Sequence, residues 1–263
     1  MPSQGQTADR YRAVQSRIQD AAVRGGYSPE GIHLVAVTKN ASIAQVRELI
    51  ELGHMDFGES RMQHYLQFAA QVDDFLERHR ELGPTEGRIP QNIRWHFIGH
   101  LQRNKVKRIL PMTRLVHSVD SLRLAEEIQA CPLQRESATE VLIQVNTSGE
   151  RGKYGIAPAA VTHLIDQMDT MMNIRIRGLM SMAPQVEDPE AVRSVFQRSR
   201  ELFEELKSSD MTGDEFDILS MGMSNDFEVA VECGANVVRV GTAIFGPPAE
   251  QEEETSTSTT SDA

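Results

Sequence analysis

Cysteine is scarce in this sequence, and no part of it is apolar for long. Only two cysteines, Cys131 and Cys233, occur in 263 residues, which excludes a disulfide framework and a cysteine-based metal site. We expect reduced, packed thiols, although a single bridge between them stays open. No run approaches the roughly 20 apolar residues of a membrane-spanning helix, and the start, MPSQGQ, does not resemble a signal peptide. The sequence predicts a soluble, cytoplasmic protein without membrane contact.

An excess of positive charge is also missing. The formal net charge is −11, from 27 basic and 38 acidic residues, so a nucleic-acid phosphate backbone would be repelled. The basic stretch at 103–108 lacks interleaved aromatic residues, and we interpret it as a solvated helix face. Residues 249–263 are acidic or Ser/Thr-rich and predict a disordered tail. This leaves 1–248 as one domain.

Short apolar runs alternate with longer amphipathic ones along the chain. The first run, 32–38, is rich in branched residues, as in a strand buried on both faces. The complete set of strand candidates is 32–38, 55–57, 94–98, 115–119, 140–145, 174–180, 217–221 and 237–240. Eight strands, each followed by a helix, in about 250 residues predict a single α/β domain, a (β/α)8 TIM barrel. A doubly wound open sheet is the alternative.

Helix signals fall between the strand candidates. Ser42 and Asp120 are expected to cap the helices that follow them, and Pro158 and Pro189 to open two more. The full set of expected helices is 43–52, a run from 122, 159–172, 190–207 and 226–233. An extra N-terminal helix over 8–24 precedes the first strand, and we expect it to cover the bottom of the barrel.

Function in a barrel lies where the strands end at their carboxyl edge. Lys39 ends the first strand. A lysine at this mouth can lose part of its hydration and become a nucleophilic amine toward a carbonyl. The alternative is an ordinary solvated lysine in a loop.

Two glycine-bearing turns follow the last two strands. The first contains Met223 and Ser224, and the second contains Gly241 and Thr242. Glycine permits close backbone approach, and the hydroxyls stand beside helix-start N–H groups, which favours an anion. The loops after strands 7 and 8 are also where barrels commonly bind phosphate. Ordinary helix caps would explain either turn alone.

Arg239 lies on the eighth strand and, in a closed barrel, beside the strand that carries Lys39. An amine, a phosphate site and a cation between them together describe a site for pyridoxal 5′-phosphate (PLP), with Arg239 as partner of the ring nitrogen. Arginine stays protonated and keeps that nitrogen unprotonated, which weakens the ring as an electron sink. A phosphate contact or a rim ion pair is the alternative for Arg239.

The motifs resemble those of the pyridoxal phosphate homeostasis protein family over nearly the whole chain. They are VAVTK at 35–39, WHFIGHLQRNK at 95–105, HSVDS at 117–121, QVN at 144–146, GLM at 178–180, LSMGMS at 219–224 and VRVGTAIFG at 238–246. The resemblance extends to the barrel domain of fold-type III PLP enzymes, without their second domain.

The resemblance implies a role for each candidate residue. Lys39 would form the Schiff base with PLP, Arg239 would meet the ring nitrogen, and Met223 would line the phosphate turn. The residues implied at the phosphate itself are Ser224, Gly241 and Thr242. Two positions depart from the family pattern: Ser60 replaces an asparagine, and His100 stands where proline is common.

Three functions compete. The first is a PLP carrier that serves PLP homeostasis without substrate turnover, acts as a monomer, and has PLP-requiring apo-enzymes as its candidate recipients. The second is an amino-acid racemase, which needs a second acid–base group; Tyr154 is the tyrosine near a strand end, and Lys153 is a second candidate amine. A hydrolase would have Glu59 alone as its strand-end acid.

His96 and His117 also invite a metal or acid–base interpretation. Without further ligands at a convincing spacing, we interpret both as hydrogen-bonded barrel histidines. We therefore predict no metal site and no catalytic residues, and we favour the carrier.

Overall fold

A computed structural model describes residues 5–81, 89–131, 138–150, 152, 154–209 and 211–247 of the chain. The expected tail at 249–263 and Lys153 lie outside these residues, so the domain boundary at 248 and the role of Lys153 stay predictions. Within the described part, none of the helices combines the length and the apolar character needed to cross a membrane. Cys131 and Cys233 are both buried and unpaired.

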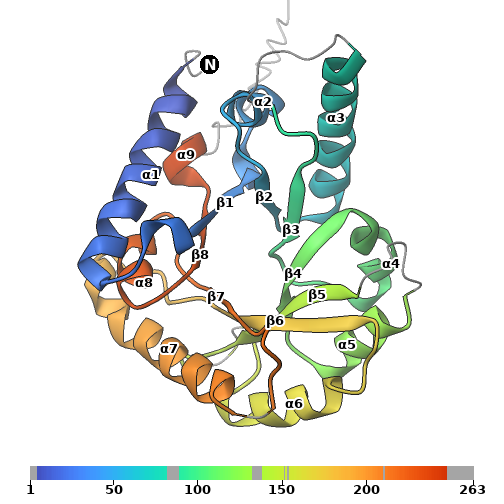
Figure 1. The fold of residues 1–263 in the computed structure, drawn as a ribbon, viewed down its shortest axis with the longest axis vertical. Coiled ribbons are helices and arrows are strands. Elements are labelled where there is room, and N and C mark those ends of the chain that lie inside the picture. Colours follow the sequence, from blue (N-terminus) through green and yellow to red (C-terminus); the bar gives the residue numbers. More distant parts are fainter. Residues whose placement is uncertain are drawn as a thin grey trace, which may run out of the picture.

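Eight parallel strands close into a barrel, as predicted (Figure 1). Each strand pairs with its neighbours in sequence, and β8 returns to β1, placing Val35 opposite Arg239. The strands are β1 His33–Val37, β2 Asp56–Glu59, β3 Arg94–Phe97, β4 Thr113–Val119, β5 Thr139–Val145, β6 Ile174–Ser181, β7 Ile218–Ser220 and β8 Val237–Val240. The (β/α)8 barrel is therefore confirmed, and the open sheet is excluded.

Helices surround the strands. They are α1 Gln6–Gly25, α2 Ile43–Glu51, α3 Met62–Glu81, α4 Val106–Ile109, α5 Leu122–Gln129, α6 Val161–Met168, α7 Arg193–Lys207, α8 Phe227–Glu232 and α9 Thr242–Phe245. Short 3-10 turns supplement them: η1 Pro29–Gly31, η2 Thr38–Asn40, η3 Arg103–Lys105, η4 Leu110–Met112, η5 Pro158–Ala160 and η6 Pro189–Val192.

Ser42 caps α2 in a capping box with Gln45, as expected. The expected cap of α5 is wrong, because Ser121 and not Asp120 occupies the N-cap position.

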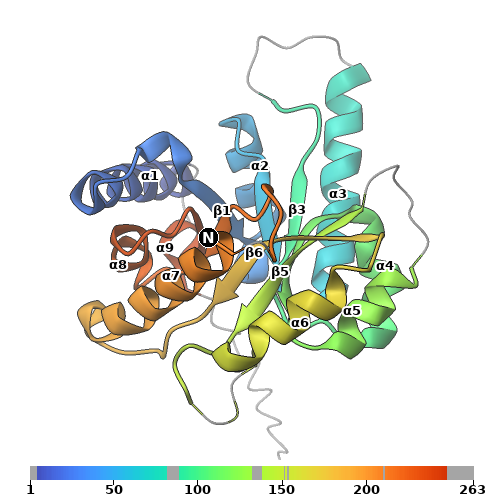
Figure 2. The ribbon, with the colours of Figure 1, turned by 60° about the horizontal axis from the view of Figure 1, so that its bottom comes forward.

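The position of α1 corrects the expectation that it covers the barrel bottom. It packs along the outer flank against α8, α9 and α2 (Figures 1 and 2). As far as the described residues go, the unit after β8 supplies the single turn α9, so they would leave the flank between α8 and α2 open without α1. An apolar stripe that includes Tyr11, Val14 and Ile18 fills it. Arg17 also forms an ion pair with Glu228 of α8 at 2.6 Å.

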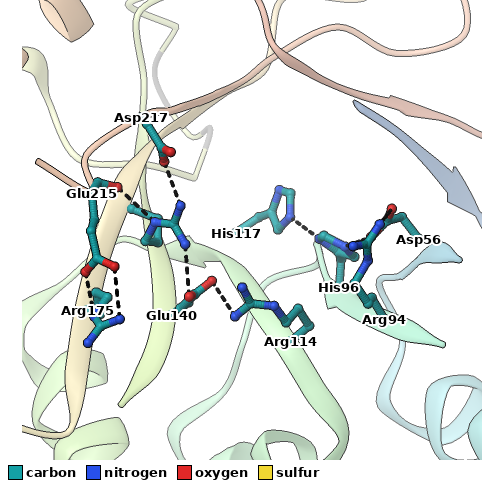
Figure 3. Close-up of polar contacts among 10 residues, drawn as sticks. Asp56, Arg94, His96, Arg114, His117, Glu140, Arg175, Glu215 and Asp217 are labelled. Carbon is teal, nitrogen blue, oxygen red and sulfur yellow. Dashed lines mark hydrogen bonds and ion pairs between the residues drawn. The ribbon is translucent and has the colours of Figure 1, made fainter. Parts of the chain in front are cut away.

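The bottom of the barrel is lined instead by charged side chains from the amino ends of the strands (Figure 3). They surround a cavity of about 200 Å³. Glu140 accepts from Arg114 at 2.5 Å and from Arg177 at 2.9 Å. Asp56 pairs with Arg94 at 2.5 Å. Asp217 also pairs with Arg177, at 2.8 Å, so three carboxylates face three guanidinium groups at this mouth and their charges balance.

The main core lies between the strands and the helices, and a smaller one lies inside the barrel. Leu115, Leu142 and Met180 make up the apolar part of the interior. The interior also holds buried polar side chains of β3, β4, β7 and β8. Arg239 faces inward, while its neighbours Val238 and Val240 belong to the outer core. This alternation along the strand sends a guanidinium into the barrel.

Candidate functional site

A cavity of about 570 Å³ opens at the carboxyl ends of the strands. That volume falls within the range of small-molecule sites. Each candidate residue of the sequence lines it: Lys39, Met223, Ser224, Arg239, Gly241 and Thr242. Residues that are distant in sequence are therefore brought to one place by barrel closure.

Lys39 sits in the turn η2, directly after β1. The buried Thr38 hydroxyl before it donates to the Glu59 carboxylate at 2.9 Å. Glu59 is fully buried and also accepts from the backbone N–H groups of Ser60 and Arg61, at 2.6 and 3.1 Å. These bonds fix the end of β1 against the end of β2. Glu59 thus supports the lysine turn and is not placed as the acid of a hydrolase.

The Lys39 side chain is exposed at the mouth. This corrects the expectation that its surroundings remove part of its hydration, because the turn carries it beyond the apolar strand. The amine is open to a ligand that enters the cavity.

The two predicted turns contact each other through Ser224. Its hydroxyl accepts from the N–H groups of Gly241 and Ala243, at 3.1 and 3.3 Å. A β-carbon at position 241 would lie 3.2 Å from the Val37 carbonyl oxygen, so a glycine lets this turn approach β1 closely. Among the described residues, the N–H groups of Ser224 and Thr242 have no hydrogen-bond partner. The turns therefore present free donors beside the cavity.

Asp226 is a cavity residue that the sequence reasoning missed, since it was taken only as the start of a helix. Its carboxylate accepts from the Met223 N–H at 2.6 Å and so shapes the first turn. Burial raises the pKa of Asp226, although the hydrogen bond from Met223 and the nearby charge of Arg239 oppose this.

Arg239 lines the cavity and is almost fully buried, with 3% of its surface exposed. It donates to the Ser220 hydroxyl at 2.6 Å and to the Ser181 carbonyl at 3.0 Å. Within the described chain it forms no ion pair. Burial lowers its pKa to about 10, against the field of Asp226. It is still charged at neutral pH, and none of the described carboxylates forms an ion pair with it.

Two aromatic rings stand at the mouth of the same cavity. His100 stacks on Tyr154 with ring centroids 4.3 Å apart, and 56% of Tyr154 is exposed. His100, which stands where proline is common in the family, therefore places an aromatic ring at the cavity mouth. Ser60, the other departure, lines the cavity as well, and its hydroxyl lies 3.5 Å from the Glu59 carboxylate.

The arrangement suits a small anionic carbonyl compound. Lys39 offers an amine, the turns offer free N–H and hydroxyl donors, and Arg239 offers a buried cation. PLP, with an aldehyde, a phosphate and a ring nitrogen, has a group for each of these. Among the described residues, no group of three or more His, Cys, Asp or Glu side chains could hold a metal ion.

Comparison with known proteins gives a consistent set of relatives. A family model described as the alanine racemase N-terminal domain matches residues 13–248. A protein of Aquifex aeolicus named Pyridoxal phosphate homeostasis protein is 36% identical over 242 residues, which cover 90% of this chain and 96% of that one. The structure of PipY from Synechococcus elongatus, with PLP bound, aligns with a TM-score of 0.74 and 29% identity over 92% of this chain and 100% of that chain.

A more distant match is limited to the fold. The alanine racemase of Corynebacterium glutamicum aligns with a TM-score of 0.59 at 16% identity, over 93% of this chain but only 64% of the racemase chain. About a third of the racemase chain therefore lies outside the part that aligns with this protein.

Proposed function

Since the chain belongs to the family of pyridoxal phosphate homeostasis proteins, we propose that it binds PLP in the cavity at the carboxyl ends of the strands and holds it without turning over a substrate. Its role would be to keep PLP available inside the cytoplasm. PLP-requiring apo-enzymes are the proposed recipients, and we propose that the protein acts as a monomer.

The observation that supports this most strongly is the buried guanidinium of Arg239, which has no ion pair with the described residues, in a cavity that also holds an exposed amine. A buried cation that has no ion pair is costly, and a ligand that accepts its hydrogen bonds and carries negative charge relieves that cost. PLP supplies an aldehyde that forms a Schiff base with an amine, and Lys39 would be that amine. Ser224, Gly241 and Thr242 would bind the phosphate beside Met223, and Arg239 would donate to the ring nitrogen.

The same residues support the proposal that the protein holds PLP without turning over a substrate. Arg239 keeps its proton at neutral pH, so the ring nitrogen that meets it has to accept a hydrogen bond and stays unprotonated. A reaction that removes the α-proton of an amino acid is then poorly supported. Racemisation would also need a second acid–base group on the opposite face of the substrate.

One observation favours the racemase as a second candidate. Tyr154 lines the same cavity as Lys39, so a tyrosine is within the site. Its ring, however, is exposed and stacked on His100.

A spectroscopic titration tests the proposal. Addition of PLP to the purified protein should produce a visible absorption band that Lys39→Ala abolishes. Lys207→Ala is the control, because Lys207 ends α7 outside the cavity, and it should leave the band unchanged. Mixing the loaded protein with a PLP-dependent apo-enzyme should restore that enzyme's activity. A band that survives in Lys39→Ala would contradict the assignment of the amine.

A further inference from the structure

A continuous row of hydrogen bonds runs through the barrel interior from Arg239 to Asp56. Arg239 Nη1 lies 2.6 Å from Ser220 Oγ, which lies 3.0 Å from His117 Nδ1. His117 Nε2 lies 2.9 Å from His96 Nδ1, and His96 Nε2 lies 3.0 Å from Asp56 Oδ1. Figure 3 shows the lower part of this row, with His117 pointing at His96 and His96 at Asp56. The row joins the PLP cavity to the opposite mouth of the barrel.

Water has little access to this row. Ser220 and His117 are fully buried, and His96 is 7% exposed. In such surroundings each polar hydrogen has to find its acceptor within the protein. Neighbouring bonds in a chain also polarise one another, which strengthens them.

The chemistry of the two end residues determines the direction in which the hydrogen bonds of this row are donated. Arginine has donors and no acceptor, so Arg239 can only donate to Ser220. Burial alone would raise the pKa of Asp56, but hydrogen bonds from His96 and Arg94 outweigh it and lower that pKa to about 2. Asp56 is therefore ionised at neutral pH and can only accept.

The protons of the residues in the middle of this row then have one consistent placement. Burial is the largest cause that lowers the pKa of His117 well below its usual value, so His117 is neutral and carries one N–H. If Ser220 accepts from Arg239, its hydroxyl hydrogen is free to donate to His117 Nδ1. The His117 proton then sits on Nε2 and is donated to His96 Nδ1. His96 in turn donates from Nε2 to Asp56.

We propose that Ser220, His117 and His96 are positioning residues for Arg239, and that they tie its guanidinium through a one-directional chain of hydrogen bonds to the carboxylate of Asp56. Ser220 is held as an acceptor because its own hydrogen is engaged by His117. The guanidinium is thereby anchored to the barrel wall, and the N–H groups that do not bond Ser220 or Ser181 remain for a ligand. The expected effect on PLP binding rests on the proposed function, whereas the row of hydrogen bonds does not depend on it.

The reverse arrangement is less favourable for two reasons. It would place the His117 proton on Nδ1, and His96 would have to donate from both nitrogens as an imidazolium. Arg94 already neutralises Asp56 from the other side, so this second cation would be uncompensated. The Ser220 hydroxyl hydrogen would also lose its acceptor in the chain.

Nitrogen-15 NMR of the histidine side chains in the cofactor-free protein tests the direction. Both His96 and His117 should be neutral and protonated at Nε2. Assignment follows from the loss of one signal set in His96→Asn and of another in His117→Asn. A His117 proton on Nδ1, or an imidazolium at His96, would overturn the proposal. Because no PLP is present, this result is independent of whether the protein binds PLP at all.

A pair of serine variants tests the positioning. Ser220→Ala removes the link between Arg239 and His117, and PLP affinity should fall by roughly tenfold, as for a lost hydrogen bond to a charged group. Ser118→Ala is the matched control, because Ser118 adjoins His117, is fully buried, and has a hydroxyl without a hydrogen-bond partner among the described residues. It should bind PLP as the wild type does.

A spectroscopic readout separates positioning from a general loss of structure. In the wild type, PLP should shift the nitrogen-15 signals of His117, and in Ser220→Ala it should leave them in place at saturation. Ser220→Thr, which keeps the hydroxyl, should restore both the shift and the affinity. Wild-type affinity in Ser220→Ala, or an unchanged His117 signal in PLP-loaded wild type, would refute the positioning role. Absence of any PLP binding by the wild type would instead refute the proposed function.

Discussion

Replacement of Arg239 by methionine should make the cofactor-free protein more stable. Burial lowers the pKa of the guanidinium from its usual value to about 10. A cation whose pKa falls on folding is destabilised in its charged form at every pH below the folded value. At 1.36 kcal/mol for each pKa unit, the cost at neutral pH is about 3 kcal/mol.

The hydrogen bonds of Arg239 offset part of this cost. Its bonds to Ser220 and Ser181 together contribute about 2 kcal/mol. Methionine of similar length buries an apolar side chain in the same space and contributes about 1 kcal/mol or more. The expected net result for Arg239→Met is a stabilisation of about 1–2 kcal/mol, or a rise in Tm of roughly 2–6 °C for a chain of this size.

Thermal unfolding followed by circular dichroism, without PLP and at neutral pH, measures the effect. Arg177→Met is the control: burial opposes the charge of Arg177 too, but Asp217 and Glu140 outweigh it and raise its pKa. Its loss should therefore lower Tm. PLP affinity in Arg239→Met should fall by about 10- to 100-fold, since bonds to a charged group are lost. A clear drop in Tm for Arg239→Met would refute the view that this guanidinium is kept for a ligand at the expense of stability.

Three further results are expected. Racemisation of alanine, serine or glutamate should not exceed the rate with free PLP; turnover that Tyr154→Phe abolishes would favour the racemase. In Arg239→Glu, α-proton exchange of an amino acid with solvent deuterium should rise per bound PLP, because a carboxylate favours a protonated ring nitrogen; an unchanged rate would place Arg239 at the phosphate instead. The lowered pKa of Asp56, from 3.8 to about 2, contributes about 2 kcal/mol above pH 4 that is lost as pH falls to 2. Asp56→Asn should flatten the stability curve in that window, and an identical curve would contradict the ion pair.

The strands and their order could be predicted because each strand of a parallel barrel is an apolar run with its own turn signals. The position of α1 could not, since it depends on how little of the flank the last unit covers. The N-cap residue of α5 was also predicted wrongly, by one position. Asp120 and Ser121 are both good caps, and the backbone decides between them.

That the candidate residues line one cavity could be predicted from a rule of position, since the carboxyl ends of the strands meet at the same mouth of a barrel. The exposure of Lys39 was missed because it depends on the path of the turn η2. The interior chain was missed because contacts among β3, β4, β7 and β8 depend on the stagger of the closed barrel. His96 and His117 were noted in the sequence, and the structure supports the interpretation that they are hydrogen-bonded barrel histidines. Ser220, which bonds His117 and Arg239, gave no signal beyond being polar in an apolar strand.

The most direct test of the account is to locate the amine that holds PLP. The loaded protein should be treated with borohydride, digested, and mapped by mass spectrometry for the reduced PLP adduct. The account predicts the adduct on Lys39 at about one per chain, and its loss in Lys39→Ala. An adduct on Lys105 or Lys207, or none above the level of PLP-treated Lys39→Ala, would contradict it.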